Sequence, residues 1–432
     1  MADKIKDIIK RDREIFLTTT RAPYEFVADH GGGDFAYDIK GKKLIDFSGF
    51  IAVYNLGVNG NAEIRAAIKK QTDKLMHSAF TDFYSELPVQ FGESLIKFFP
   101  KGFGRMFLSN SGTEANEAAI KFSRIFTKRQ YILSFYNSFH GRSMGSLGLT
   151  ASRAIQRAHY GPFSNVIHAP FPYPYRCLFN KGEHRCGHDY LDYIDDYIFK
   201  KEVLPEEVAA IVLEPIQGEG GYIVPPEDFI KGIRKIANDN GILLISDEIQ
   251  AGYMRTGKFL ALENFGVTAD IYTMAKALGG GLPMGATVVR TSLGDLPRGA
   301  HASTFGGNHL AVAAASASLK YVKEHKRELE AGVKRKSAIF FKRLREMQDK
   351  YEIIGDVRGI GLMVGIELVK NRKTKELAIA EHERIVKSAF RKGLLLLTCG
   401  ESVIRFAPPL TISESSIEKG LNILEDAIKE NQ

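Results

Sequence analysis

An aspartate and a lysine, Asp247 and Lys276, occupy the stretch of this sequence best suited to chemistry. The run from Ile242 to Ser246 consists of isoleucine, leucine and serine without helical alternation, which predicts a short strand buried on both faces. Asp247 follows this run directly. Its carboxylate is therefore expected at the carboxyl end of a buried strand, where open α/β sheets bind their ligands.

Lys276 is the one charged residue between Ile271 and Leu282, and three glycines follow it closely. Such a lysine is expected to be partly desolvated, which lowers its pKa and makes a neutral, nucleophilic amine available near neutral pH. The pair suits pyridoxal 5'-phosphate (PLP), which needs a lysine for its Schiff base and a carboxylate to keep its pyridine nitrogen protonated. A surface lysine and a helix-capping aspartate are the alternative on these two residues alone.

A turn rich in hydroxyl groups, Asn110-Ser111-Gly112-Thr113, lies between a predicted strand at residues 106–108 and a helical pattern from Thr113. Unpaired backbone N–H groups and the helix dipole at such a turn favour an anion, so it is a candidate phosphate site. An ordinary capping turn is the alternative reading. Nearby, Phe139 and Arg142 share a loop of glycines and serines, which offers a flat face for a ring and a fork for a carboxylate.

A second buried strand is predicted at residues 208–213, and its exit sequence Glu-Pro-Ile-Gln-Gly-Glu places Glu214 and Glu219 at the ligand edge of the sheet. A predicted helix at residues 227–240 leads from there to the strand before Asp247. Strand, helix and strand over this length predict a parallel crossover and hence the α/β class.

Length and composition predict two domains in an ordinary globular protein of 432 residues. We expect an N-terminal segment of a small domain at residues 1–60, a large cofactor-binding domain at 61–315 and the C-terminal small domain at 316–432. The formal net charge is +8, but the lysines and arginines are spread among 51 acidic residues and form no dense basic stripe. This pattern favours anionic small molecules over nucleic acid as partners. No apolar run is as long as a membrane span, and the first residues lack the pattern of a signal peptide, so a cytoplasmic location without membrane partners is expected.

Cys177 and Cys186 flank a short loop with His184 and His188 nearby. A disulfide or a small metal site is conceivable there, but the spacing lacks a CxxC element and favours a plain structural loop. No metal is expected.

Six motifs, in order and at these distances, resemble the class III (omega) aminotransferases, PLP enzymes of fold type I. They are NSGTEAN, FHGR, EPIQGEGG, SDEIQAGYMRTG, TMAKALGGGLPMGA and STFGGN. The resemblance extends from about Asp34 to Leu410. It implies a large domain with a mostly parallel seven-stranded sheet, a small α+β domain from both chain ends, and a homodimer with active sites at its interface.

The resemblance also implies roles for single residues. Lys276 forms the Schiff base and shuttles a proton, while Asp247 pairs with the ring nitrogen. The resemblance further implies that Gln250 reaches the phenolic oxygen of the cofactor and that Phe139 and Ile249 cover the two faces of its ring. The residues implied to hold the phosphate are Ser111, Gly112 and Thr113, and Thr304 reaches the phosphate of the neighbouring subunit.

For the substrate, the resemblance implies that Arg142 holds a distal carboxylate. Glu219 pairs with Arg405 when the substrate lacks an α-carboxylate and swings away when Arg405 must bind one. Ile51 stands where ornithine-type members carry tyrosine, which favours a 4-aminobutyrate-like pocket. The sequence departs from the family pattern at residues 58–61, 253–254 and 309, and the first two of these stretches are expected to border the entrance.

The expected function is transfer of an amino group from an omega-amino acid donor to the 2-oxo acid acceptor 2-oxoglutarate by a ping-pong mechanism. The alternative is a PLP-dependent amino-acid racemase or epimerase. Such an enzyme uses the same lysine but returns the proton to the opposite face of the α-carbon.

Overall fold

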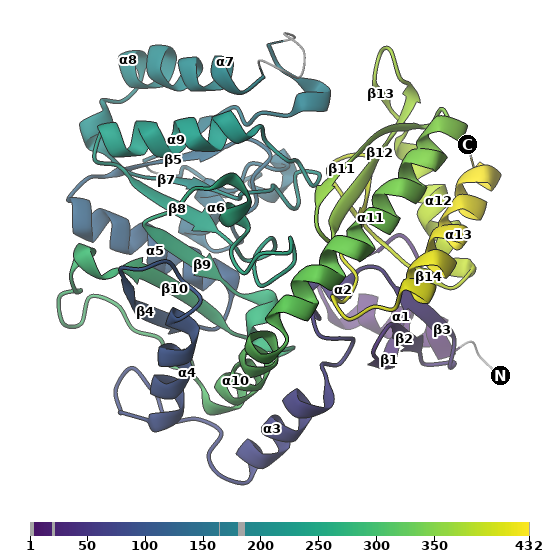
Figure 1. Ribbon diagram of the computed structural model, residues 1–432, viewed down its shortest axis with the longest axis horizontal. Coiled ribbons are helices and arrows are strands. Elements are labelled where there is room, and N and C mark those ends of the chain that lie inside the picture. The colour runs from purple at the N-terminus through teal and green to yellow at the C-terminus, as the bar shows by residue number, and fades with distance from the viewer. Residues whose placement is uncertain (1–3, 20–21, 164, 180–185, 432) are drawn as a thin grey trace.

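The computed structural model describes residues 4–19, 22–163, 165–179 and 186–431. It contains a large α/β part and a smaller part built from both ends of the chain, and helix α11 (Lys326–Lys350) runs from one to the other (Figure 1). No helix among the described residues is long and apolar enough to cross a membrane.

The large part is organised around a seven-stranded sheet with the order β4-β10-β9-β8-β7-β5-β6. The strand β10 is antiparallel to both of its neighbours, and the pairs among β9, β8, β7, β5 and β6 are parallel. The strands in chain order are β4 (Phe103–Ser109), β5 (Tyr131–Phe135), β6 (Val166–Ala169), β7 (Val208–Leu213), β8 (Leu243–Asp247), β9 (Ile271–Met274) and β10 (Gly285–Arg290). This is the mostly parallel seven-stranded sheet that the sequence predicts.

Helices cover both faces of this sheet. Every residue of β7 is buried, and its side chains divide between two hydrophobic clusters, as a strand with two covered faces requires. Helix α5 (Gly112–Thr127) contributes Ala118 and Phe122 to one cluster, and helix α9 (Glu227–Asp239) contributes Ile230 and Ile233 to the other. The helices return the chain so that the carboxyl ends of β7, β8 and β9 share one edge.

The smaller part combines two sheets. One holds β1 (Ala28–Gly32), β2 (Phe35–Asp38) and β3 (Lys43–Asp46) together with β14 (Leu394–Leu395), which pairs parallel to β3. The other holds β11 (Ile354–Ile360), β12 (Met363–Asn371), β13 (Glu376–Leu377), β15 (Leu397–Cys399) and β16 (Val403–Phe406). Figure 1 shows this part as purple and yellow-green segments side by side, so both chain ends build it, as predicted.

The remaining helices complete these layers. They are α1 (Lys4–Ile15), α3 (Ala62–Thr72), α4 (Glu86–Ile96), α6 (Met144–Leu149), α7 (Cys186–Tyr193), α8 (Phe199–Lys201), α10 (His309–Glu324), α12 (Ile379–Arg391) and α13 (Glu414–Asn431). The helical pattern at residues 62–77 predicts a helix there, and α3 ends five residues before the end of that pattern, at Thr72.

The pattern at residues 34–57 predicts two or three short strands, and two of them form, β2 and β3. The stretch at residues 49–52 adds no third strand. Instead, Phe50, Ile51 and Ala52 all have positive φ angles and form a left-handed turn, labelled α2 (Gly49–Ala52). Such backbone is costly for residues with a Cβ atom, so tertiary contacts must hold it.

Candidate active site

The predicted lysine and aspartate lie together at the carboxyl edge of the large sheet. Asp247 is the last residue of β8, and Lys276 follows β9 by two residues. Both line a cavity of about 460 Å³. The turn before α5, the loop after β5 and the exit of β7 complete its walls, so the segments of five separate motifs converge on one hollow.

Lys276 has the properties of a nucleophilic amine. Burial lowers the pKa of its ammonium group, the Asp247 carboxylate opposes this shift and the Arg405 charge adds to it, and the resulting pKa is about 8. Its φ angle of 44° is strained for a residue with a side chain, which is common where a reactive group must be aimed. A neutral amine is therefore accessible in mildly alkaline solution.

Asp247 is held by donors on both of its oxygen atoms. Asn116 Nδ2 and His140 Nδ1 each lie 2.8 Å from Oδ2, and the Ile249 backbone N–H donates to Oδ1 at 3.0 Å. Asn116 is itself fixed, because Thr273 Oγ1 donates to its side-chain oxygen at 2.8 Å. The carboxylate is 3% exposed, so these donors replace water in stabilising its charge.

The His140 imidazole lies behind this carboxylate, with Nδ1 2.8 Å from Asp247 Oδ2. Burial lowers the pKa of its imidazole, but the hydrogen bond and the charge of Asp247 outweigh burial and leave the pKa raised. The neighbouring Glu214 accepts from the backbone N–H groups of Phe139 at 2.9 Å and Gly218 at 2.8 Å. Burial raises the Glu214 pKa to about 7. The loop that carries Phe139 is thus fastened to the exit of β7.

The turn at residues 111–113 has the form of an anion cradle. Ser111 caps α5 by accepting from Glu114 N–H at 3.3 Å, and a Cβ atom on Gly112 would lie 2.8 Å from Ile249 Cδ1. Only a residue without a side chain therefore brings its backbone this close to the cavity. Thr113 Oγ1 accepts from the Ser143 N–H at 3.1 Å, which ties the turn to the loop after β5.

The cavity fits PLP on the evidence of its own groups. Phe139 and Ile249 line it, Gln250 Oε1 is buried without a partner among the described residues, and a helix N-terminus and a carboxylate complete the set. Arg142 also lines the cavity, with its guanidinium 5.3 Å from the centre of the Phe139 ring. A flat cofactor with a phosphate and a basic ring nitrogen has a matching partner for each end and each face.

Glu219 and Arg405 lie beyond the lining of this cavity and form an ion pair. Arg405 Nη1 is 3.2 Å from Glu219 Oε2. The guanidinium is nearly buried, whereas the Glu219 carboxylate is 27% exposed. The pair that the resemblance implies is therefore formed, and its acidic partner has room to move.

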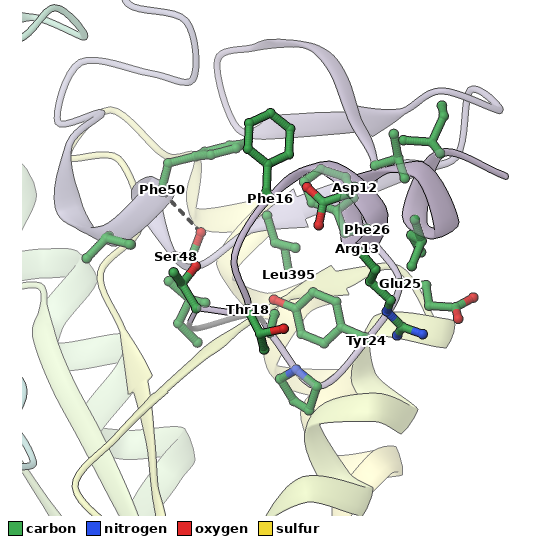
Figure 2. Close-up of a pocket in the computed structure, with 18 of the residues that line it drawn as sticks. Asp12, Arg13, Phe16, Thr18, Tyr24, Glu25, Phe26, Ser48, Phe50 and Leu395 are labelled. Carbon is green, nitrogen blue, oxygen red and sulfur yellow. Dashed lines mark hydrogen bonds between the residues drawn. The ribbon is translucent and has the colours of Figure 1, made fainter. Parts of the chain in front are cut away.

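Ile51 lines a second cavity, of about 1060 Å³, and not the first one. Figure 2 shows Ser48 and Phe50 on one side of this second cavity and Asp12, Arg13 and Glu25 on the other, with Leu395 between. Its wall is continuous with the Arg405 region, because Leu397 lines it and is the cross-strand partner of Arg405.

Other predicted features have mixed outcomes. Thr304 is exposed and does not line the cavity of its own subunit. Residues 180–185, most of the loop between Cys177 and Cys186, lie outside the described residues. The two cysteines are not joined by a disulfide, and no group of potential metal ligands occurs among the residues that are described.

Sequence reasoning gave no role to Asn116, His140 or Thr273. All three belong to the motifs already quoted or border them. The signal available was the predicted burial of Asp247, because a buried carboxylate requires donors and these residues flank the neighbouring strand ends.

The fold and the site suit a PLP-binding enzyme with a buried lysine in its cavity, and comparison with known proteins identifies its family. The family model described as Aminotransferase class-III matches residues 18–428. The chain belongs to this family of PLP-dependent enzymes.

Three similar proteins illustrate the range of activities. A leucine/methionine racemase of Thermococcus litoralis is 40% identical over 98% of this chain and 95% of its own length. A 5-aminovalerate aminotransferase of Pseudomonas aeruginosa is 37% identical over the full length of both chains. The structure of taurine:2-oxoglutarate aminotransferase from Bifidobacterium kashiwanohense, solved with PLP and glutamate, has a TM-score of 0.91 at 29% identity, covering 100% of this chain and 98% of the other.

The lowered pKa of Lys276 predicts how the apoprotein takes up PLP. Because the neutral amine is the nucleophile, the uptake rate should rise with pH around a midpoint near 8. Asp247→Asn removes a charge that raises this pKa, so the midpoint should move to lower pH. Stopped-flow absorbance of PLP mixed with apoprotein measures both, and a wild-type midpoint near that of free lysine, about 10.4, would contradict this assignment.

Proposed function

We propose that the protein is an aminotransferase that moves an amino group from an omega-amino acid of the 4-aminobutyrate type to 2-oxoglutarate by a ping-pong mechanism. The observation that carries the proposal is the ion pair between Glu219 and Arg405. When Glu219 and Arg405 are paired, their charges cancel, and the surface suits a substrate without an α-carboxylate. When Glu219 turns away, the guanidinium of Arg405 can donate two hydrogen bonds to the α-carboxylate of the keto acid.

The chain supplies positioning and proton transfer. When bound, PLP provides a ring that takes up the electron pair left as a proton leaves the substrate carbon. Asp247 would hold the proton on the ring nitrogen, and Asn116 and His140 orient its carboxylate. The Lys276 amine would remove the proton from the carbon that carries the substrate nitrogen and return it two bonds away, to the cofactor carbon bound to that nitrogen, and Arg142 would bind the distal carboxylate of either substrate.

A racemase is the second candidate, because the 40% identical relative from Thermococcus litoralis is a leucine/methionine racemase. Both reactions begin with removal of the same proton. They differ in where Lys276 or a second base returns it.

One experiment separates the two candidates. The holoenzyme is mixed with single amino acids and no 2-oxo acid, and absorbance and optical rotation are followed together. Transfer predicts stoichiometric loss of the visible cofactor band, greatest with omega-amino acids, whereas racemisation predicts a persistent band and loss of rotation by an L-amino acid. The Lys276→Ala variant should neither lose the cofactor band through transfer nor racemise an L-amino acid. Multiple turnovers by this variant would show that Lys276 is not needed for the reaction.

The ion pair predicts a division between the two half-reactions. Arg405→Ala should raise the KM for 2-oxoglutarate by about 10- to 100-fold, because it removes a charged hydrogen-bond donor. The half-reaction with an omega-amino acid should change by less than about threefold, by the same scale. Glu219→Gln is the matched control and should impair chiefly the donor half-reaction; equal losses in both half-reactions would contradict the gate.

We also propose that the active enzyme is a homodimer in which Thr304 reaches the phosphate of the partner subunit. An exposed apolar patch supports this, formed by residues 75–84 and Phe305. The centroids of the His77 and Phe305 rings lie 4.7 Å apart, with the rings tilted by 34°. Ser303 Oγ accepts a hydrogen bond from Asn110 Nδ2 at 3.1 Å, which connects the patch to the turn before α5.

This interface predicts that assembly and cofactor retention are linked. Phe305→Asp places a charge in the patch and should yield a monomer that loses PLP on dilution. Sedimentation velocity and the visible band measure the two properties. Phe83→Ser is a milder companion, and a Phe305→Asp protein that remains dimeric with full PLP would refute this interface.

A further inference from the structure

The left-handed turn Gly49–Ala52 is strained and needs support. The φ angles of Phe50, Ile51 and Ala52 are 49°, 67° and 57°. Backbone in this region is unfavourable for each residue with a Cβ atom. The turn places Phe50 and Ile51 in the wall of the second cavity (Figure 2), so its conformation determines what a substrate meets there.

The buried carboxylate of Asp46 holds the start of the turn. Its Oδ1 accepts from Ser48 N–H at 2.7 Å, Ser48 Oγ at 2.6 Å and Gly49 N–H at 3.1 Å. Ser48 Oγ in turn accepts from Phe50 N–H at 3.1 Å, the bond drawn in Figure 2. These bonds compensate part of the backbone strain only while Asp46 is ionised.

The guanidinium of Arg255 donates hydrogen bonds to the segment that follows this turn and to two other segments. It has no exposed surface. Its Nη2 donates to Asn55 Oδ1 at 2.6 Å, and its Nη1 donates to the carbonyl groups of Pro408 at 2.5 Å and Leu362 at 3.1 Å. A flat fork of donors suits three acceptors from three segments, which a lysine ammonium cannot match with the same geometry.

Two of these three segments carry residues that the proposed function assigns to the substrate. Asn55 follows Ile51 by four residues, and Pro408 follows Arg405 by three. Arg255 itself follows the cofactor residue Asp247 by eight. The guanidinium therefore connects the edge of the large sheet to both substrate-facing elements of the smaller part, although it lines neither cavity.

We propose that Arg255 is a positioning residue for the substrate: it fixes the left-handed turn and Arg405 relative to the cofactor site without contacting substrate or cofactor. This inference rests on the proposed function, because it concerns the binding of the α-carboxylate at Arg405.

The charge of Arg255 acts together with its hydrogen bonds. Burial raises the pKa of Asp46 to about 6, and the positive charge of Arg255 lowers it. The phenol of Tyr24 is also within electrostatic reach of Asp46. Loss of Arg255 thus removes a cation that keeps Asp46 an acceptor for the turn.

The test compares Arg255→Met and Arg255→Lys with Arg234→Met. Arg234 is a matched control, because it is also largely buried but pairs with Asp270, at 2.6 Å, near the opposite ends of the strands. Steady-state kinetics with 2-oxoglutarate, the melting temperature and the visible cofactor band are measured for each holoenzyme.

Arg255→Met should raise the KM for 2-oxoglutarate about tenfold or more, corresponding to about 1.4 kcal/mol. Its kcat should stay within about threefold and its PLP should be retained, since Lys276 and Asp247 are untouched. Arg255→Lys should give an intermediate KM because it keeps the charge. Arg234→Met should lower the melting temperature without changing the KM.

Equal effects of Arg255→Met and Arg234→Met on KM, or a fall in kcat at constant KM, would overturn the inference. If Arg255→Met does not fold, Arg255→Lys and Asn55→Ala are judged by the same ratio of KM to kcat. Absence of 2-oxoglutarate turnover in the wild type would instead refute the proposed function, so the two failures are distinguishable.

Discussion

The buried carboxylate of Asp247 is the constraint on which the rest of the site depends. Asp247 is 3% exposed, and a charge buried to this degree is unfavourable unless several hydrogen-bond donors surround it. Here the donors come from α5, from the loop after β5 and from the backbone of Ile249, two residues after Asp247. Each donor belongs to a segment that also presents a cofactor-facing group. Satisfying this one carboxylate therefore aligns the phosphate turn, the Phe139 loop and the strand ends.

The substrate side of the site depends on a different part of the fold. Arg405 lies in β16 and Ile51 in the turn Gly49–Ala52, both in the part built by the two chain ends, whereas Lys276 follows β9 of the large sheet. The proposed substrate recognition therefore requires the two parts to keep a fixed relation. The guanidinium of Arg255 supplies direct hydrogen bonds across that junction, and the strain at residues 50–52 shows that the junction has a demanding geometry.

The sequence predicted the elements whose environment is uniform along the chain. The strand at residues 208–213 matches β7 because it is apolar and covered on both faces, and Asp247 and Lys276 lie together because parallel strands end at one edge. Asn116 and Thr273 were not predicted to contact one another because their contact is long-range and has no local pattern. The left-handed turn lies within residues 34–57, where the pattern predicts two or three short strands, and nothing local reveals that Asp46 and Arg255 hold it.

The central claim is that Lys276 is the residue that binds PLP covalently, and borohydride reduction tests it most directly. The PLP-loaded protein is reduced, digested and analysed by mass spectrometry. The account predicts one pyridoxyl group per chain, on Lys276, and none on Lys276→Ala treated in the same way. A label on another lysine, with Lys276 unmodified, would contradict the account.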